Sequence, residues 1–243
     1  MKVIKCKDYK EASQIAGEII SKAISERPNI VLGLATGSSP IGIYNHLIQD
    51  YKDNKISFKD VKTYNLDEYV GIGRDCPQSY YYFMNEHLFD HIDINKNNVH
   101  IPYADPSCLE ESCKRYSEEL ENTVVDIQLL GIGANGHIGF NEPKTSFEQK
   151  TFIVNLTEKT REDNKRFFDS IDDVPTKAIT MGIKEIMNAR KIVLIATGKN
   201  KALAMQKLLS GEITTDFPAS ILHKHKDVVV VTDEEALSLV NTL

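Results

Sequence analysis

Apolar residues recur along the chain in short continuous runs, and longer segments with helical periodicity separate these runs. Continuous runs rich in Val, Ile and Leu are typical of strands that are covered on both faces. They predict strands at residues 29–35, 61–66, 98–102, 124–133, 191–197 and 226–232. The intervening segments predict helices at residues 8–26, 40–51, 79–90, 107–122, 157–168, 181–189, 199–210 and 233–241.

This alternation predicts an α/β fold with a mostly parallel sheet, because parallel strands need crossover connections, which helices usually supply. Residues 1–243 contain no repeat, low-complexity tract or linker-like stretch, so we expect a single domain. In sheets of this kind the ligand lies beyond the carboxyl ends of the strands. Residues that carry chemistry should therefore follow strands directly or open the helices that come next, and four segments fit this expectation.

The composition limits the classes of function. With 243 residues, 41% of them hydrophobic, the chain can bury a sizeable core. Its net charge of −6 argues against general binding to nucleic acid or to an anionic membrane, so an anionic substrate would need a local cationic pocket. We expect a cytoplasmic protein with free thiols, because no signal segment or membrane-spanning run is present and the four cysteines lack metal-ligand spacing.

The first segment is "ATGSSP", which follows a predicted strand. Thr36, Gly37, Ser38 and Ser39 form a turn of small residues, and Pro40 opens a helix for which the preceding serine is a suitable N-cap. Backbone N–H groups, hydroxyls and the positive end of the helix dipole could together hold a phosphate group. The alternative is an ordinary capped turn.

The second segment is "NLDEYVG", in which Asp67 and Glu68 follow the next strand. Paired acids in a loop are often simply solvated. At the carboxyl end of a strand, however, one of them could be a general base or a metal ligand. Partial burial among apolar neighbours would raise the pKa of such a carboxylate and make it a better base.

The third segment, "LLGIGANGHIGFNEP", has the glycine spacing of a dinucleotide-binding turn at Gly131, Gly133 and Gly136. That turn would have to continue into a helix, which Gly139 and Pro143 prevent, and no acidic residue for the ribose follows at the expected distance. We therefore do not expect a dinucleotide here.

The same segment has several polar residues. His137 and Glu142 could form a general acid–base pair, in which the carboxylate orients the imidazole. The alternative is a buried structural histidine. Asn135 and Asn141 favour the acid–base interpretation, because four hydrogen-bonding side chains within eight residues are unusual for a plain turn.

The fourth feature is cationic. Arg161, Lys165 and Arg166 lie in one predicted helix, and Lys199 and Lys201 follow the strand that ends in "LIATG". Arg166 or Lys201 could complete a phosphate clamp with the small-residue turn. The alternative is that all of them are solvated surface charges.

These segments together suit a small phosphorylated metabolite that is converted by proton transfers alone. The chain carries no recognisable cofactor or metal motif, since its seven histidines are scattered and His223-x-His225 has no third ligand nearby. Isomerisation of a sugar phosphate is the natural class, because it needs an acid–base pair to open the ring and a base to move a carbon-bound proton.

The residues "GLATGSSP", "NLDEYVG", "SYYYFM", "GANGHIGFNEP" and "GKNKALA" together resemble the glucosamine-6-phosphate deaminase family over essentially the whole chain. The resemblance implies a Rossmann-like three-layer α/β/α sandwich. It also implies conversion of glucosamine 6-phosphate and water to fructose 6-phosphate and ammonia, without a cofactor. The runner-up is a 6-phosphogluconolactonase, which has a related fold, and a non-enzymatic alternative is a sugar-phosphate sensor that lacks catalytic residues.

Position by position, the resemblance implies that Asp67 moves a proton from C2 to C1 and that His137 opens the ring with Glu142 oriented against it. Asn135 stands where some family members have aspartate, so it can orient the histidine but cannot ionise. The phosphate would lie on the Thr36–Ser39 turn, with Arg166 and Lys201 beside it.

The resemblance also implies a mobile lid at about residues 155–173. Some family members are hexamers activated by N-acetylglucosamine 6-phosphate through an arginine and a lysine. These positions are Phe152 and Val154 here, and an apolar pair is unsuited to a phosphate dianion. We therefore expect a monomer or small homo-oligomer without this activation.

Overall fold

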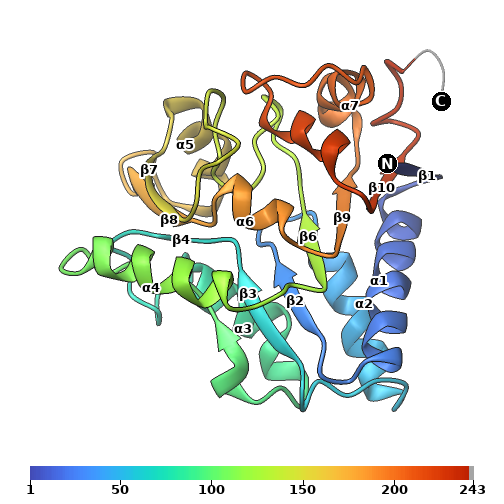
Figure 1. The fold of residues 1–243 in the computed structure, drawn as a ribbon, viewed down its shortest axis with the longest axis horizontal. Helices are drawn as coiled ribbons and strands as arrows, with labels where there is room; N and C mark the ends of the chain where they lie inside the picture. The colour runs from blue at the N-terminus through green and yellow to red at the C-terminus, as the bar shows by residue number, and fades with distance from the viewer. Residues whose placement is uncertain (241–243) are drawn as a thin grey trace.

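The computed structural model describes residues 1–240, and it contains a seven-stranded sheet in which all neighbouring strands are parallel (Figure 1). The order is β1-β10-β9-β6-β2-β3-β5. These strands are β1 (Lys2–Cys6), β2 (Val31–Leu34), β3 (Lys62–Asn65), β5 (Val99–His100), β6 (Ile127–Leu130), β9 (Lys191–Ala196) and β10 (Val228–Asp233).

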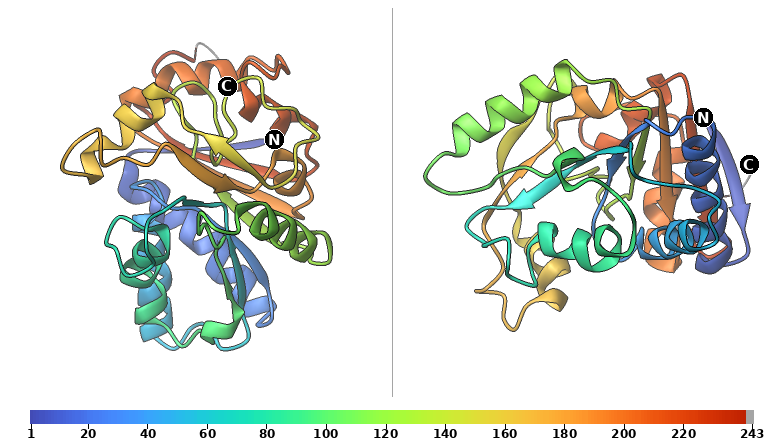
Figure 2. Two further views of the ribbon diagram at one scale, coloured as in Figure 1. Left: turned by 90° about the vertical axis from the view of Figure 1, so that its left-hand side faces the viewer. Right: turned by 90° about the horizontal axis from the view of Figure 1, so that it is seen from below.

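Helices cover both faces of this sheet and make a three-layer α/β/α arrangement. In the left view of Figure 2, α1 and α2 lie on one side of the sheet and α7 on the other. The α-helices are α1 (Tyr9–Glu26), α2 (Ile41–Lys52), α3 (Tyr80–His87), α4 (Leu109–Glu121), α5 (Glu158–Asn164), α6 (Ile183–Met187) and α7 (Ala202–Leu209). Short 3-10 helices are η1 (Phe89–His91), η2 (Lys96–Asn98), η3 (Lys165–Phe167), η4 (Lys199–Lys201) and η5 (Pro218–Lys224).

Local sequence explains why these helices form where they do. The Asp8 side chain accepts a hydrogen bond from the N–H of Glu11 and so caps the start of α1. The buried residues of α1 recur every three or four positions and face the sheet and α2. Ser79 caps α3 and Thr157 caps α5 in the same way.

The central strands have the burial that continuous apolar runs predict. Every residue of β6 and β10 is buried, as are all residues of β9 after Lys191. The prediction of a mostly parallel α/β sheet with its carboxyl ends at one edge is therefore confirmed. The four cysteines are free thiols, as expected.

A second, three-stranded sheet was not predicted. It has the order β4-β8-β7 and is antiparallel, with strands β4 (Asp67–Tyr69), β7 (Phe152–Asn155) and β8 (Lys177–Thr180). Helix α5 and η3 connect β7 to β8. Aromatic rings from three parts of the chain pack beside this sheet, since Tyr69 lies 4.7 Å from Tyr80 and 5.8 Å from both Phe140 and Phe168, measured between ring centroids.

Two expectations for local structure are wrong. The segment predicted as a helix at 233–241 forms turns through residue 239, and residue 241 lies outside the described residues. Asp233 ends β10 instead, and its carboxylate accepts hydrogen bonds from the N–H groups of Gly198 and Ala236. Helix α2 starts at Ile41 with Pro40 as its N-cap, so Ser39 does not cap it.

Candidate active site

The four segments singled out in the sequence follow strands of the two sheets. The turn at 36–39 follows β2, the loop at 131–142 follows β6, and Lys201 lies shortly after β9. Asp67 comes two residues after β3 and opens β4. Because neighbouring strands of the large sheet are parallel, the turns after β2, β6 and β9 lie at one edge of it.

Asn135, His137 and Glu142 form a hydrogen-bonded row in the loop after β6. Oδ1 of Asn135 lies 2.8 Å from Nδ1 of His137, and Nδ2 of Asn135 donates to Oε2 of Glu142 at 2.8 Å. The distance from Nδ1 to Oε2 is 3.9 Å, so the amide links the histidine to the carboxylate. An ionised carboxylate can only accept, so Oδ1 is left to face the imidazole. This arrangement places the imidazole proton on Nδ1 and leaves a lone pair on Nε2.

The surroundings of His137 favour its neutral form. Burial lowers the pKa of His137 below its usual value, and the Lys201 cation adds to this effect against the opposing charge of Glu142. The ring packs so closely on Gly133 that a Cβ there would lie 2.2 Å from Cε1 of His137. Glycine at this position therefore makes room for the imidazole. Residues 131–151 form no helix, whereas a dinucleotide-binding turn would continue into one.

Asp67 is a buried carboxylate beside the same loop. It is 6% exposed, and within residues 1–240 its side chain makes no hydrogen bond. Burial and then the charge of Glu68 raise the pKa of Asp67 to about 8. A Cβ on Gly139, whose φ is +56°, would lie 3.5 Å from Oδ2 of Asp67. The Asp67 carboxylate therefore lies against the loop that carries His137.

The neighbouring Glu68 has a structural role. Its carboxylate accepts hydrogen bonds from the N–H groups of Tyr80 and Tyr81 at 2.9 Å each, and from the N–H of Tyr69 at 2.8 Å. Tyr80 and Tyr81 are the first residues of α3, so Glu68 binds the positive end of that helix. Of the two adjacent acids, Asp67 alone keeps a carboxylate that no N–H of the described residues occupies.

The turn at 36–39 has the features of an anion site. Gly37 has a φ of +89°, and within the described residues the N–H groups of Gly37, Ser38 and Ser39 donate no intramolecular hydrogen bond. The Tyr9 hydroxyl lies 3.1 Å from the carbonyl oxygen of Ser38 and accepts from the N–H of Gly42 at 2.8 Å. The Tyr9 hydroxyl therefore accepts a hydrogen bond from the first turn of α2, as the Ser39 side chain was expected to do.

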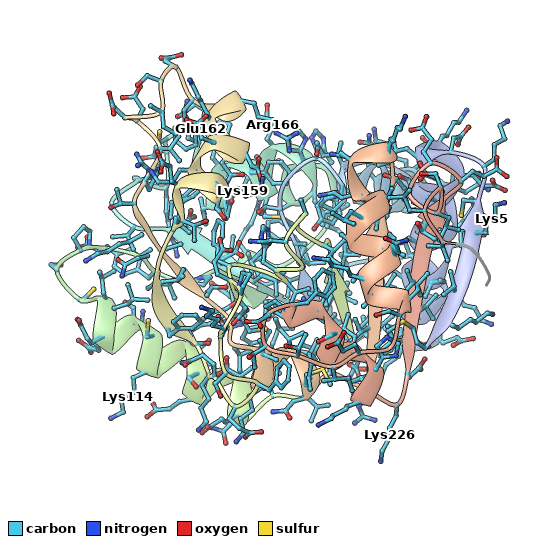
Figure 3. All side chains as sticks on the ribbon, turned by 90° about the horizontal axis from the view of Figure 1, so that it is seen from above. Lys5, Lys114, Lys159, Glu162, Arg166 and Lys226 are labelled. Atoms are coloured by element: carbon cyan, nitrogen blue, oxygen red, sulfur yellow. The ribbon has the colours of Figure 1, made fainter. Side chains whose placement is uncertain are left out.

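Arg166 lies close to this turn, and Lys201 lies near enough to Arg166 for their charges to interact. Nη2 of Arg166 lies 3.4 Å from Oγ of Ser38. Arg166 belongs to η3, which lies in the connection between β7 and β8 of the three-stranded sheet. Figure 3 shows Arg166 on the side of this connection that faces the rest of the molecule. Burial, and next the charge of Arg166, lower the pKa of Lys201, whose Nζ donates to the carbonyl oxygen of Ile132 at 2.8 Å. Two cations near a turn with available N–H groups suit a phosphate dianion.

Arg161 has a structural role instead. The Arg161 guanidinium donates to the carbonyl oxygens of Ile171 and Val174, so it holds the connection between β7 and β8 together.

No group of three or more His, Cys, Asp or Glu side chains that could hold a metal occurs within residues 1–240. In the same part of the chain, no helix is long and apolar enough to cross a membrane.

Some residues at the site were not predicted. The Thr160 hydroxyl and the more distant Thr157 hydroxyl, at 3.4 Å, both donate to Oε1 of Glu142. Tyr9 holds the turn at 36–39 from the start of α1. These partners lie far from the motifs in sequence, and threonine or tyrosine alone gives no signal of such a role.

Comparisons with known proteins identify the family of this chain. Residues 9–231 match the model of the glucosamine-6-phosphate isomerases/6-phosphogluconolactonase family. A glucosamine-6-phosphate deaminase of Thermoanaerobacter sp. (strain X514) is 56% identical over 99% of this chain and 95% of its own length. A structure described as a monomeric glucosamine-6-phosphate deaminase is 50% identical, covers 98% of this chain and 100% of its own, and superposes with a TM-score of 0.97.

The lactonase branch is more distant. A 6-phosphogluconolactonase from Trypanosoma brucei superposes with a TM-score of 0.80 over 98% of both chains but is only 19% identical, which shows a shared fold alone. The chain therefore belongs to the glucosamine-6-phosphate isomerase/6-phosphogluconolactonase family, and within that family to the glucosamine-6-phosphate deaminases.

Proposed function

We propose that this protein converts glucosamine 6-phosphate and water to fructose 6-phosphate and ammonia, as an isomerising hydrolase of a C–N bond in amino-sugar breakdown. One observation carries the proposal. A buried carboxylate whose pKa is raised to about 8, that of Asp67, lies against the loop that holds a neutral histidine in a hydrogen-bonded row. Ring opening and transfer of a carbon-bound proton need these two groups together.

His137 opens the pyranose ring. Its Nε2 lone pair takes the proton of the O1 hydroxyl and returns a proton to O5 as the C1–O5 bond breaks. The imidazolium that forms in between is stabilised through Nδ1 by Asn135 and, beyond it, by the Glu142 carboxylate. Asn135 transmits orientation rather than charge, since an amide does not ionise.

Asp67 then acts on the open-chain aldehyde. It removes the proton from C2 and delivers it to C1. O1 gains a proton and the amino nitrogen loses one in the same conversion, so the amino aldehyde becomes a C2 imine with a hydroxyl group on C1. Water adds to this imine, and ammonia leaves as the C2 carbonyl of fructose 6-phosphate forms. A carboxylate with a pKa near 8 is a far stronger base than a solvated aspartate and remains able to ionise near neutral pH.

The phosphate is held by the turn of Thr36, Gly37, Ser38 and Ser39, together with Arg166 and Lys201. Binding energy from this remote group positions C1 and C2 between the base and the histidine. The segment at about 155–173, which brings Arg166, acts as a lid that excludes water from the reactive intermediate. The reaction needs no cofactor and takes place in the cytoplasm.

The assay that tests this function measures ammonia and fructose 6-phosphate released from glucosamine 6-phosphate by the purified protein. The matched substrate is 6-phosphogluconolactone, the substrate of the distant branch of the family. Release of both products in equal amounts with no lactone hydrolysis supports the proposal. Lactone hydrolysis without ammonia release contradicts it.

We further propose that N-acetylglucosamine 6-phosphate does not activate this enzyme and that it functions as a monomer or small homo-oligomer. Val154 is 7% exposed in the apolar cluster that includes Tyr69 and Phe140, and Phe152 packs against that cluster. An apolar pair used in this way offers no charge to a phosphate dianion. The prediction is a hyperbolic substrate-saturation curve, unchanged by the acetylated sugar phosphate. A sigmoidal curve that this compound makes hyperbolic would contradict it.

A further inference from the structure

The Glu142 carboxylate is held from two sides, and only one side belongs to its own loop. Oε2 accepts from Asn135, which lies in the loop after β6. Oε1 accepts from the hydroxyl of Thr160, and at 3.4 Å from that of Thr157. Both threonines belong to the β7–β8 connection, which is the segment proposed as the lid. The two oxygens of one carboxylate thus join two separate parts of the fold.

These hydroxyls are placed for this contact by helix α5. Thr157 is the N-cap of α5, and its Oγ1 accepts from the N–H of Thr160 at 3.2 Å. Oγ1 of Thr157 also lies 3.0 Å from Oγ1 of Thr160. Thr160 is 3% exposed and Glu142 is 7% exposed, so their hydrogen bond is formed away from bulk water. Hydrogen bonds to a charged group in such surroundings are stronger than those at the surface.

We propose that Thr160, supported by Thr157, is a positioning residue for the His137–Asn135–Glu142 row, so that ring opening requires the β7–β8 connection to be docked. This inference rests on the proposed function. Without the hydroxyl of Thr160, Glu142 can rotate away from Asn135. The amide then no longer fixes the imidazole with its lone pair on Nε2. Within the described residues, the Asp67 carboxylate makes no hydrogen bond to either threonine, so the later transfer of the C2 proton should be affected much less.

The test compares Thr160→Val with Thr160→Ser. Valine keeps the shape of threonine but removes the hydroxyl, whereas serine keeps the hydroxyl. We expect Thr160→Val to lower kcat on cyclic glucosamine 6-phosphate by about ten- to a hundredfold, which is the loss of a hydrogen bond to a charged group. On an analogue that cannot close to the pyranose, the loss should stay under about threefold. KM should change little, and Thr160→Ser should retain most of the activity.

The matched control is Thr63→Val in β3. Thr63 is 1% exposed and its hydroxyl has no partner among the described residues, so this variant makes the same chemical change in the core without touching Glu142. Its activity on both substrates should equal that of the wild type. Circular dichroism and thermal unfolding of every variant identify any that does not fold. If Thr160→Val does not fold, Thr160→Ala takes its place, and Thr157→Val should show a smaller loss with the same substrate dependence.

The outcomes separate the two proposals. A wild-type protein that releases no ammonia overturns the proposed function, and this inference with it. An active wild type whose Thr160→Val variant loses the same factor on both substrates, or loses nothing, overturns only the positioning role. Failure of Thr160→Ser to retain activity also overturns it, since a side chain needed only for packing or size would behave in that way.

Discussion

The seven-stranded sheet and the three-stranded sheet contribute to the site in different ways. The large sheet has buried central strands, and the turn at 36–39 and the loop at 131–142 follow the carboxyl ends of two of its strands. The strands of the small sheet have only three or four residues, yet β4 begins with Asp67. The connection between β7 and β8 contains Arg166 and the threonines that donate to Glu142. Under the proposed function, the large sheet contributes most of the phosphate site. The small sheet contributes Asp67 as the base, and its β7–β8 connection contributes Arg166 and the threonines beside Glu142.

The largest effect is expected from the small sheet, in Asp67→Asn. The amide is nearly isosteric but cannot remove a proton, so turnover should fall by about a thousandfold or more while KM stays similar. Solvent-deuterium incorporation at C2 is the direct measurement, and it should be abolished. Normal incorporation by this variant would refute the role of Asp67 as the base and remove the main contribution assigned to the small sheet.

The same variant should stabilise the protein at neutral to alkaline pH. Because the folded-state pKa of Asp67 is raised to about 8, the native protein holds a proton that the unfolded chain has already lost. The free energy of unfolding of the wild type therefore falls as pH rises from about 4 to about 8. Asp67→Asn removes this dependence and should be more stable at pH 8 by a few kcal/mol. Urea unfolding at pH 5 and pH 8 measures the difference.

The next effect concerns the loop of the large sheet. His137→Gln removes the proton acceptor for ring opening and should lower turnover of the cyclic substrate by about a hundredfold. An open-chain analogue bypasses this step and should lose less than about threefold. Parallel kinetics on the two substrates provide the check. Equal losses on both would mean that the histidine acts after ring opening, together with Asp67.

A third effect is the dependence of the wild-type rate on pH. Asp67 must be ionised to act as a base, so kcat/KM should rise about tenfold between pH 7 and pH 9, with its midpoint near the pKa of about 8. The lowered pKa of His137 keeps the imidazole neutral across this range. A rate that does not change above about pH 6 would mean that the catalytic base has the pKa of an ordinary carboxylate, which contradicts this prediction.

The smallest effect is expected from the turn at 36–39, the proposed phosphate site. Tyr9→Phe removes the hydroxyl that bonds the Ser38 carbonyl oxygen and the N–H of Gly42. KM should rise about three- to tenfold with kcat unchanged, because a neutral hydrogen bond contributes on the order of 1 kcal/mol. Initial-rate kinetics give both constants. A fall in kcat without a change in KM would mean that the turn after β2 acts in the chemical step rather than in substrate binding.

The sequence predicted the large sheet better than the small one, for a physical reason. Strands buried on both faces leave continuous apolar runs, and such runs predicted β2, β3, β6, β9 and β10. Strands β4, β7 and β8 are too short to show alternation, and "DEY" contains two acids. The segment predicted as a helix after β10 forms only turns. The N–H of Leu237 bonds the carbonyl oxygen four residues back, whereas those of Ser238 and Val240 bond carbonyl oxygens three residues back.

The residues of the candidate site were also predicted unevenly. Its motif residues were visible because polar side chains after buried strands stand out, and the structure brings His137, Asn135 and Glu142 together. The adjacent acids looked alike in sequence. Only the fold shows that Glu68 binds the start of α3 while Asp67 stays buried without a hydrogen bond from the described residues. Tyr9 and Thr160 could not be predicted, since their partners are distant in the chain.

The row through Asn135 also has a consequence for the ageing of the enzyme. Asn135 precedes Gly136, and asparagine is thermolabile because the next backbone nitrogen can attack its side chain and release ammonia. Here that nitrogen donates to the carbonyl oxygen of Gly133 at 3.0 Å, and both ends of the amide are held by His137 and Glu142. The contacts that orient the histidine thus also protect the asparagine from deamidation. Heat that loosens this loop would let Asn135 become aspartate or isoaspartate, which when ionised cannot donate to Glu142, and the lost hydrogen bond would not return on cooling.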